Sequence, residues 1–263
     1  MKYNEQVKAV FFDVDGTLLD FRTHELSESS VQAVEQLQAA GIRCALATSR
    51  PLRTIKEVPG LMEIPWDGIV SGTGMMVYDG QGRLICDRGF PQNTLEQIVS
   101  TAKNASLPVY MAGEEVIMTE DSDLVEPFLN KYNVTVDAVR PWTGEKPVLI
   151  TLLTTDHDYA RELFENIPGI ELVSAGRENM DIHLKGIDKP DGIRVLMDHW
   201  KLPPAAFAAV GDTGIDSSML EAASPGLCMP LGEQAAKESA DAVLEDHGPD
   251  TILTGMKRYI LQD

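Results

Sequence analysis

The chain has 263 residues, 43% hydrophobic and 24% charged, enough for one large domain or for a core domain with a smaller second one. Its 22 basic and 41 acidic residues give a formal charge of −19, which disfavours nucleic acid and anionic membranes as partners. No segment approaches the roughly 20 apolar residues that span a bilayer, and no apolar signal follows the first lysine, so we expect a cytoplasmic protein without a membrane partner.

The N-terminal part alternates predicted strands and helices. Residues 7–12 (VKAVFF) and 42–47 (IRCALA) are apolar strands, and a helical pattern at 27–41 lies between them and ends at Gly41. Near-continuous apolar strands are typical of a parallel sheet that is covered on both faces. This order predicts a βαβ unit with a right-handed crossover.

The pattern changes between residues 84 and 184. Short alternating strands and amphipathic helices replace the long apolar strands, and loops rich in Gly and Pro (DGQGR and KGIDKPDG) flank the region. The sequence therefore predicts an inserted α+β domain at 84–184, which interrupts a core domain formed by 1–83 and 185–263.

The C-terminal part returns to the alternation of the first part. Predicted helices at 191–200, 216–223 and 233–240 alternate with predicted strands at 205–212 and 226–229. The two core segments together predict an α/β fold with a doubly wound, Rossmann-like parallel sheet.

Polar residues gather where the predicted core strands end, which is where ligands bind in open α/β sheets. Asp13 and Asp15 follow the first strand, and positions i and i+2 of an extended chain point the same way. The other candidates follow later strands or open the helix after the exit loop. They are Thr48, Ser49, Arg50, Lys189, Asp212 and Asp216.

These residue types fit phosphoryl transfer. The four aspartates would form an oxygen-rich cluster suited to Mg²⁺, which would offset their mutual repulsion. A carboxylate that faces the cation and a phosphoryl group can act as nucleophile, a role we give to Asp13, while its neighbour Asp15 acts as general acid and base. Thr48 can donate to a phosphate oxygen, and the Lys189 ammonium can offset charge in the transition state.

Each residue also has a structural explanation when it is taken alone. DxDG can be a simple Asx turn, and Thr48 can cap a strand end. A lone Lys189 is usually a solvated surface residue, and for Arg50 a structural salt bridge is as reasonable as a substrate contact. The joint pattern favours function over these alternatives.

Four segments resemble, in order, the four motifs of the haloacid dehalogenase-like superfamily: DVDGTLL, ATSRP, KGIDKPDGI and GDTGIDSSML. The insert between the second and third motifs resembles the cap domain of the Cof-type branch, and the resemblance spans essentially the whole chain. It implies an aspartyl-phosphate mechanism with the roles given above. It also implies that Mg²⁺ is held by Asp13, the Asp15 carbonyl and Asp212, with support from Asp216.

The chain departs from the usual pattern of that branch at a few positions. Ser49 and Pro190 stand where the branch commonly has Gly, and Ser71 stands where it commonly has Asn. Ile215 replaces the Asn of GDxxND, which removes an amide from the polar network of the site and bears on metal positioning, rate and substrate preference.

The sequence therefore predicts a Mg²⁺-dependent phosphatase that acts on a small phosphorylated metabolite, such as a sugar phosphate, with the insert closing as a lid. One alternative is a sugar-phosphate phosphotransferase or mutase, since an alcohol can replace water. Another is a weakly active ligand-binding or regulatory homologue, because of Ile215.

Arg177, with Glu178 and Asp181, is a candidate substrate contact in the insert. A monomer and a small homo-oligomer both fit the sequence.

Overall fold

The computed structural model describes residues 6–20 and 23–262, which fall into two compact units. Unit 1 comprises the described parts of Met1–Ser49, Ile55–Asp87 and Asp188–Asp263, and unit 2 comprises Arg50–Thr54 and Arg88–Ile187. Residues 1–5, where we expect no secretory signal, lie outside the described residues. Within 6–20 and 23–262, no helix has the length and apolar character needed to cross a membrane.

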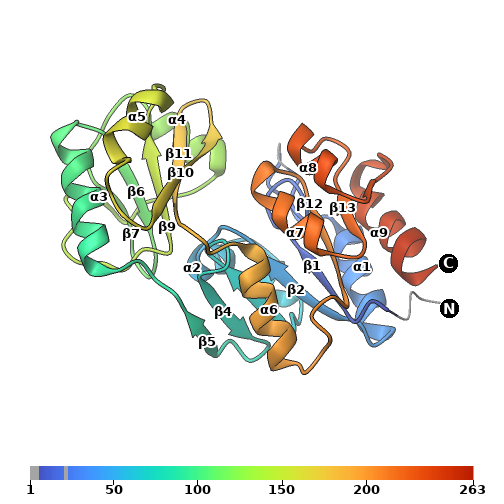
Figure 1. The fold of residues 1–263 in the computed structure, drawn as a ribbon. Helices are drawn as coiled ribbons and strands as arrows, with labels where there is room; N and C mark the ends of the chain where they lie inside the picture. The colour runs from blue at the N-terminus through green and yellow to red at the C-terminus, as the bar shows by residue number, and fades with distance from the viewer. Residues whose placement is uncertain (1–5, 21–22, 263) are drawn as a thin grey trace. The chain divides into compact units, whose positions relative to one another are not determined.

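Unit 1 contains an eight-stranded sheet (Figure 1). In sheet order the strands are β14 (Ala242–Val243), β13 (Gly226–Cys228), β12 (Phe207–Gly211), β1 (Ala9–Phe12), β2 (Arg43–Ala47), β3 (Gly68–Ser71), β4 (Met76–Asp79) and β5 (Leu84–Asp87). The pairs from β14 to β3 are parallel, whereas β3–β4 and β4–β5 are antiparallel. The predicted doubly wound sheet is confirmed, with an antiparallel edge added to it. Because β1 lies between β2 and β12, the strand order reverses there, which is where ligands bind in such sheets.

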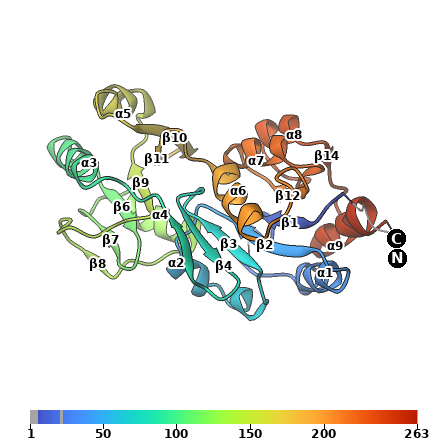
Figure 2. The same cartoon turned by 60° about the horizontal axis from the view of Figure 1, so that its bottom comes forward.

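The helices of unit 1 form two groups, and the helices within each group lie side by side (Figure 2). α1 (Glu28–Ala39) packs beside α9 (Thr251–Met256), while α6 (Lys189–His199), α7 (Ser217–Ala222) and α8 (Gln234–Ser239) run next to one another. Phe11 of β1 belongs to a buried cluster with Leu196 of α6 and Leu220 of α7. Its neighbour Phe12, which points to the other face because side chains alternate along a strand, is also fully buried. Burial on both faces explains why these strands are apolar throughout.

The edge strand β5 differs from the sequence-based expectation. We expect Leu84 to open the insert, but β5 pairs antiparallel with β4 and completes the sheet of unit 1. The turn between the two strands is fixed by Asp79, whose Oδ1 accepts from the amides of Gln81 and Arg83 at 2.9 Å each. The second segment of unit 2 begins at Arg88. A short strand pattern does not identify the sheet that the strand joins.

Unit 2 is an α+β structure with a six-stranded sheet. In sheet order the strands are β10 (Ile170–Gly176), β11 (Asn179–Leu184), β9 (Leu149–Leu153), β6 (Val109–Ala112), β7 (Val116–Met118) and β8 (Ala138–Val139), all antiparallel except β7–β8. Its helices are α3 (Gln92–Asn104), α4 (Val125–Tyr132) and α5 (His157–Phe164), and the first residues of α2 (Leu52–Lys56) also belong to it. Phe128 of α4 packs edge-on against Tyr110 of β6, with ring centroids 5.2 Å apart.

Candidate functional site

The chain turns immediately after β1. The Asp13 amide still donates to the Val210 carbonyl of β12 at 2.9 Å, but the Leu19 amide donates back to the Val14 carbonyl at 2.9 Å. Asp13 therefore lies just beyond the end of β1 at Phe12, and Asp15 lies in the turn that follows. The carboxylates of Asp13, Asp212 and Asp216 form a close group that does not include Asp15, although the Asp15 charge contributes to raising the pKa of Asp13.

The turn after β1 lies directly against Asp212. Gly16 has a φ of +80°, and a Cβ atom there would lie 2.2 Å from Asp212 Oδ2, so only glycine fits. The Thr17 hydroxyl donates to Asp212 Oδ1 at 3.2 Å. Sequence reasoning missed this role of Thr17, and the available signal was a hydroxyl residue directly after DVDG.

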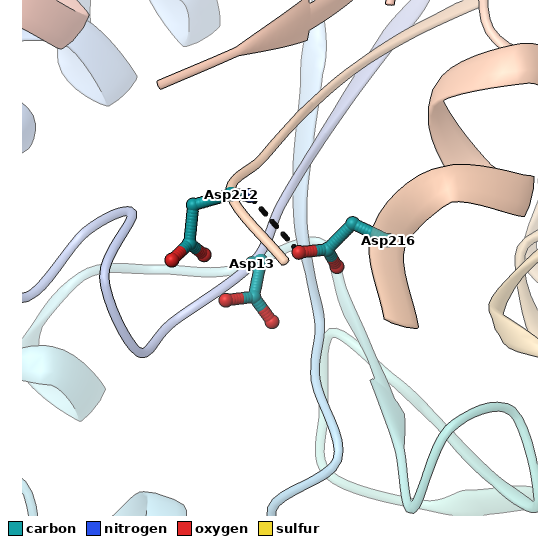
Figure 3. Close-up of side chains that lie close together, drawn as sticks. All are labelled: Asp13, Asp212 and Asp216. Carbon is teal, nitrogen blue, oxygen red and sulfur yellow. Dashed lines mark hydrogen bonds between the residues drawn. The ribbon is translucent and has the colours of Figure 1, made fainter. Parts of the chain in front are cut away.

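The loop after β12 brings Asp212 and Asp216 together. The Asp216 carboxylate accepts, through Oδ2, from the Asp212 amide at 3.0 Å (Figure 3). The Thr213 amide donates to the same oxygen at 3.0 Å. A Cβ atom on Gly211 would lie 2.6 Å from the Asp216 side chain, which shows how tightly the loop folds. Ile215, the departure from the family pattern, is half-buried in this loop and offers it no polar side-chain group.

Lys189 is the first residue of α6 and is only 1% exposed. Asp188 caps the helix and Asp191 completes a capping box, so carboxylates complement the helix start while the lysine side chain points elsewhere. Its Nζ donates to Asp13 Oδ1 at 2.7 Å and to Asp216 Oδ1 at 2.5 Å. The alternative of a solvated surface lysine is therefore wrong.

Three carboxylates converge at this end of the sheet. Asp13, Asp212 and Asp216 each offer an oxygen, and these atoms all lie within 4.8 Å of one another (Figure 3). Burial raises the pKa of Asp13 well above its usual value, partly opposed by the Lys189 ammonium. Burial and the neighbouring Asp216 charge raise the pKa of Asp212 to about 7.

Among residues 6–20 and 23–262, one ammonium group, that of Lys189, donates hydrogen bonds to this cluster. Burial alone would lower the pKa of Lys189, but the Asp13 and Asp216 carboxylates outweigh it, and the pKa is raised. When all three carboxyl groups are ionised, this single positive charge does not balance them. Hard oxygen ligands of this kind fit Mg²⁺, which binds carboxylates and retains several waters.

Thr48 and Ser49 follow β2. β2 pairs in parallel with β1 in the register Phe12 to Leu46, so Thr48 comes just beyond the strand end at the same edge as Asp13. Thr48 is fully buried, and its amide donates to the Val70 carbonyl at 2.9 Å. Ser49 is half-buried and ends the first segment of unit 1.

The remaining candidates, Arg50 and Arg177, belong to unit 2. Exposed Arg177 and its neighbour Glu178 form the turn between β10 and β11. Asp181 of β11 is 7% exposed and accepts from the Thr151 hydroxyl at 2.6 Å, and burial raises its pKa. Substrate contacts by these residues stay predictions.

Comparisons with known proteins point to one family. A family model described as haloacid dehalogenase-like hydrolase matches residues 10–256. The 5-amino-6-(5-phospho-D-ribitylamino)uracil phosphatase YitU of Bacillus subtilis is 26% identical over 267 residues, which cover 95% of this chain and 96% of that protein. The chloroplastic endoribonuclease YBEY of Arabidopsis thaliana is 24% identical over 98% of this chain, but the chain spans only 47% of that longer protein.

Solved structures share the fold over nearly the whole chain. The phosphatase BT1666 from Bacteroides thetaiotaomicron gives a TM-score of 0.85 at 22% identity, covering 98% of this chain and 97% of that one. The subclass IIB sugar phosphatase BT4131 gives a TM-score of 0.82 at 25% identity, covering 96% and 98%.

Proposed function

The chain belongs to the haloacid dehalogenase-like hydrolase family, and we propose that it is a Mg²⁺-dependent phosphatase that hydrolyses small phosphate monoesters through an aspartyl-phosphate intermediate. Its family and the named phosphatases among its relatives make the chain a phosphatase. The metal, the substrate class and the roles of the residues are our proposal.

The observation that carries the proposal is the charge balance at the end of β1. Three carboxylates have oxygens within 4.8 Å of one another, and the buried Lys189 pairs with two of them, Asp13 and Asp216. Like charges at this spacing repel one another, so a purely structural role would leave this repulsion uncompensated. A site that binds a divalent cation and receives a phosphoryl group accounts for both the surplus charge and the buried ammonium.

We assign the chemistry to residues of unit 1. In the first step an Asp13 oxygen bonds to phosphorus while the bond from phosphorus to the ester oxygen breaks, and Asp15 gives a proton to the leaving alcohol. In the second step Asp15 takes a proton from water, the water oxygen bonds to phosphorus, and the bond to Asp13 breaks. Inorganic phosphate leaves, and both carboxyl groups return to their starting states.

The other groups support these steps. Lys189 already donates to Asp13 Oδ1, so we assign the attack to the second oxygen and charge compensation to the ammonium. Asp13, Asp212 and the Asp15 carbonyl would hold the cation, and Asp216 would hold the loop that carries Asp212. When bound, Mg²⁺ supplies positive charge that favours the approach of an anionic ester.

For the substrate we propose a small phosphorylated sugar or polyol. The relative YitU is named for a substrate that carries a phosphoribityl group, and BT4131 is described as a sugar phosphatase. The formal charge of −19 disfavours large polyanions, whereas a small ester needs only local positive charge.

A hydrolysis screen tests the proposal. The wild type is assayed for inorganic phosphate release from a panel of phosphorylated sugars and polyols, with Mg²⁺ and with EDTA. Asp13→Asn is expected to lose at least about 10³-fold in kcat while it keeps its fold by circular dichroism, because the nucleophile is gone. The matched control is Asp198→Asn, an exposed aspartate of α6.

Two outcomes would contradict the proposal. Hydrolysis by Asp13→Asn at the rate of the control would refute the assignment of the nucleophile. Wild-type protein that releases no phosphate from any ester in the presence of Mg²⁺ would refute the activity itself. Phosphate recovered on an added alcohol instead of in solution would favour the phosphotransferase alternative.

A further inference from the structure

The loop that carries Asp212 and Asp216 is held from a second side. Inside the loop, Asp216 accepts from the amides of Asp212 and Thr213. Outside it lies Glu233, which precedes α8 and which sequence reasoning did not single out. The Glu233 carboxylate accepts from the Gly214 amide at 2.8 Å, and the Glu233 amide donates to the Asp212 carbonyl at 2.7 Å. One residue therefore binds the loop on both sides of Thr213.

The approach of the two segments is close. A Cβ atom on Gly232 would lie 2.7 Å from the Cys228 sulfur and 2.8 Å from the Asp212 carbonyl oxygen, so a larger residue there would push the segment away. A Cβ atom on Gly214 would lie 3.3 Å from the Glu233 carboxylate. Glycines on both segments permit the contact.

The Glu233 side chain is not used for its own helix. Glu233 is the N-cap of α8, yet its side chain makes no capping hydrogen bond. Ser, Thr, Asp and Asn are the usual N-cap residues because their short side chains reach the free amides of the first turn. Glutamate gives up that role here, and its longer side chain reaches Gly214 instead.

We propose that Glu233 is a positioning residue for the divalent cation, an inference that rests on the proposed function. It fixes the backbone on either side of Thr213 and so sets the direction of the Asp212 carboxylate. Ile215 contributes no polar group to this loop, which leaves the outer side to Glu233. The role needs a hydrogen-bond acceptor of the right length and does not need its negative charge.

Two conservative substitutions separate reach from charge. Glu233→Gln keeps the length and a carbonyl acceptor but removes the charge, and it is expected to bind Mg²⁺ within about threefold of wild type. Glu233→Asp keeps the charge and is a better N-cap, but it is one methylene too short to reach Gly214. It is expected to weaken Mg²⁺ binding by about 10- to 100-fold, as is usual when a residue that orients a metal ligand is changed.

The readouts are the Mg²⁺ dissociation constant from titration calorimetry, the Mg²⁺ concentration for half-maximal hydrolysis, and the melting temperature in EDTA. Glu238→Asp, the same change on the exposed side of α8, is the control and is expected to match wild type. The EDTA melting temperature of Glu233→Asp is expected to stay near that of the control, which separates positioning from a loss of fold.

The outcomes distinguish this inference from the proposed function. Wild-type affinity in Glu233→Asp, or equal losses in Glu233→Gln and Glu233→Asp, would overturn the positioning role alone. A wild-type protein that binds no Mg²⁺ would overturn the metal-dependent function and this inference with it.

Discussion

Two groups of carboxylates, one in each unit, are balanced in different ways. In unit 2 each of three carboxylates lies against an arginine: Asp137 pairs with Arg53, and Glu115 and Glu145 each lie 2.7 Å from Arg140. The hydrogen bonds from Arg53 are the main reason that the pKa of Asp137 is lowered to about 2. Such pairs are satisfied within the unit and need no further ligand.

In unit 1 the balance is the opposite. Lys189 pairs with Asp13 and Asp216 but not with Asp212, and burial raises the pKa of Asp13 and of Asp212. Ordinary ion pairing explains Asp137, Glu115 and Glu145, but it leaves a surplus of negative charge at the site in unit 1 when its three carboxylates are ionised. A candidate site is therefore recognised by unbalanced charge rather than by the number of charges, and three substitutions test this contrast.

The largest effect is expected from Lys189→Gln. The substitution leaves two buried carboxylates without their cation, and breaking a buried pair in this way costs about 3–5 kcal/mol. The free energy of unfolding in urea, measured in EDTA at pH 8, should fall by that amount. Lys56→Gln, at an exposed lysine of unit 1, should leave it unchanged. A loss below about 1 kcal/mol for Lys189→Gln would mean that the surplus charge is already relieved by other means.

A smaller effect is expected from Asp212→Asn. At a Mg²⁺ concentration of 100 times the dissociation constant, bound cation should stabilise the wild type by about 2.7 kcal/mol, and this gain should vanish in the variant. Mg²⁺ must displace the proton of Asp212, whose pKa is about 7, so the wild-type affinity should rise as the pH rises through 7.

The metal-free protein provides the check on Asp212→Asn. Because the pKa of Asp212 is raised on folding, its carboxyl contributes stability that is present at low pH and is lost as the pH rises through about 7. In EDTA, Asp212→Asn should therefore gain in unfolding free energy relative to wild type between pH 5 and pH 8. A variant that is less stable than wild type across that range would contradict the assignment.

Much of the site was predictable because parallel strands end at one edge of a sheet. Asp13, Thr48 and Asp212 follow β1, β2 and β12, and the order of the strands alone brings these positions together. Lys189 was predictable as a lysine at a helix start, where a cation is unfavourable unless it faces an anion.

The rest depends on tertiary contacts that no local pattern specifies. The role of Asp15 stays a prediction, because Asp15 lies in the turn beyond β1, where no strand period fixes the direction of a side chain. The Thr17 hydroxyl and Asp212 are 195 residues apart in the sequence, so their contact exists only once the sheet has formed. Leu84 was misplaced because an edge strand has the same pattern in either sheet.

The smallest effect, and one of opposite sign to that of Asp212, is expected from Asp137→Asn in unit 2. Because folding lowers the pKa of Asp137 to about 2, its stabilising contribution is present above the ordinary aspartate pKa and is lost as the pH falls toward 2. The side chain is 42% exposed, so solvent screens the pair, and the variant should lose less than about 1 kcal/mol at pH 7. The loss, measured against Asp123→Asn as an exposed control, should shrink both at pH 3 and in 1 M salt. A loss that instead grows as the pH falls would show that Asp137 is not simply an arginine-paired carboxylate, and the contrast between the two units would then fail.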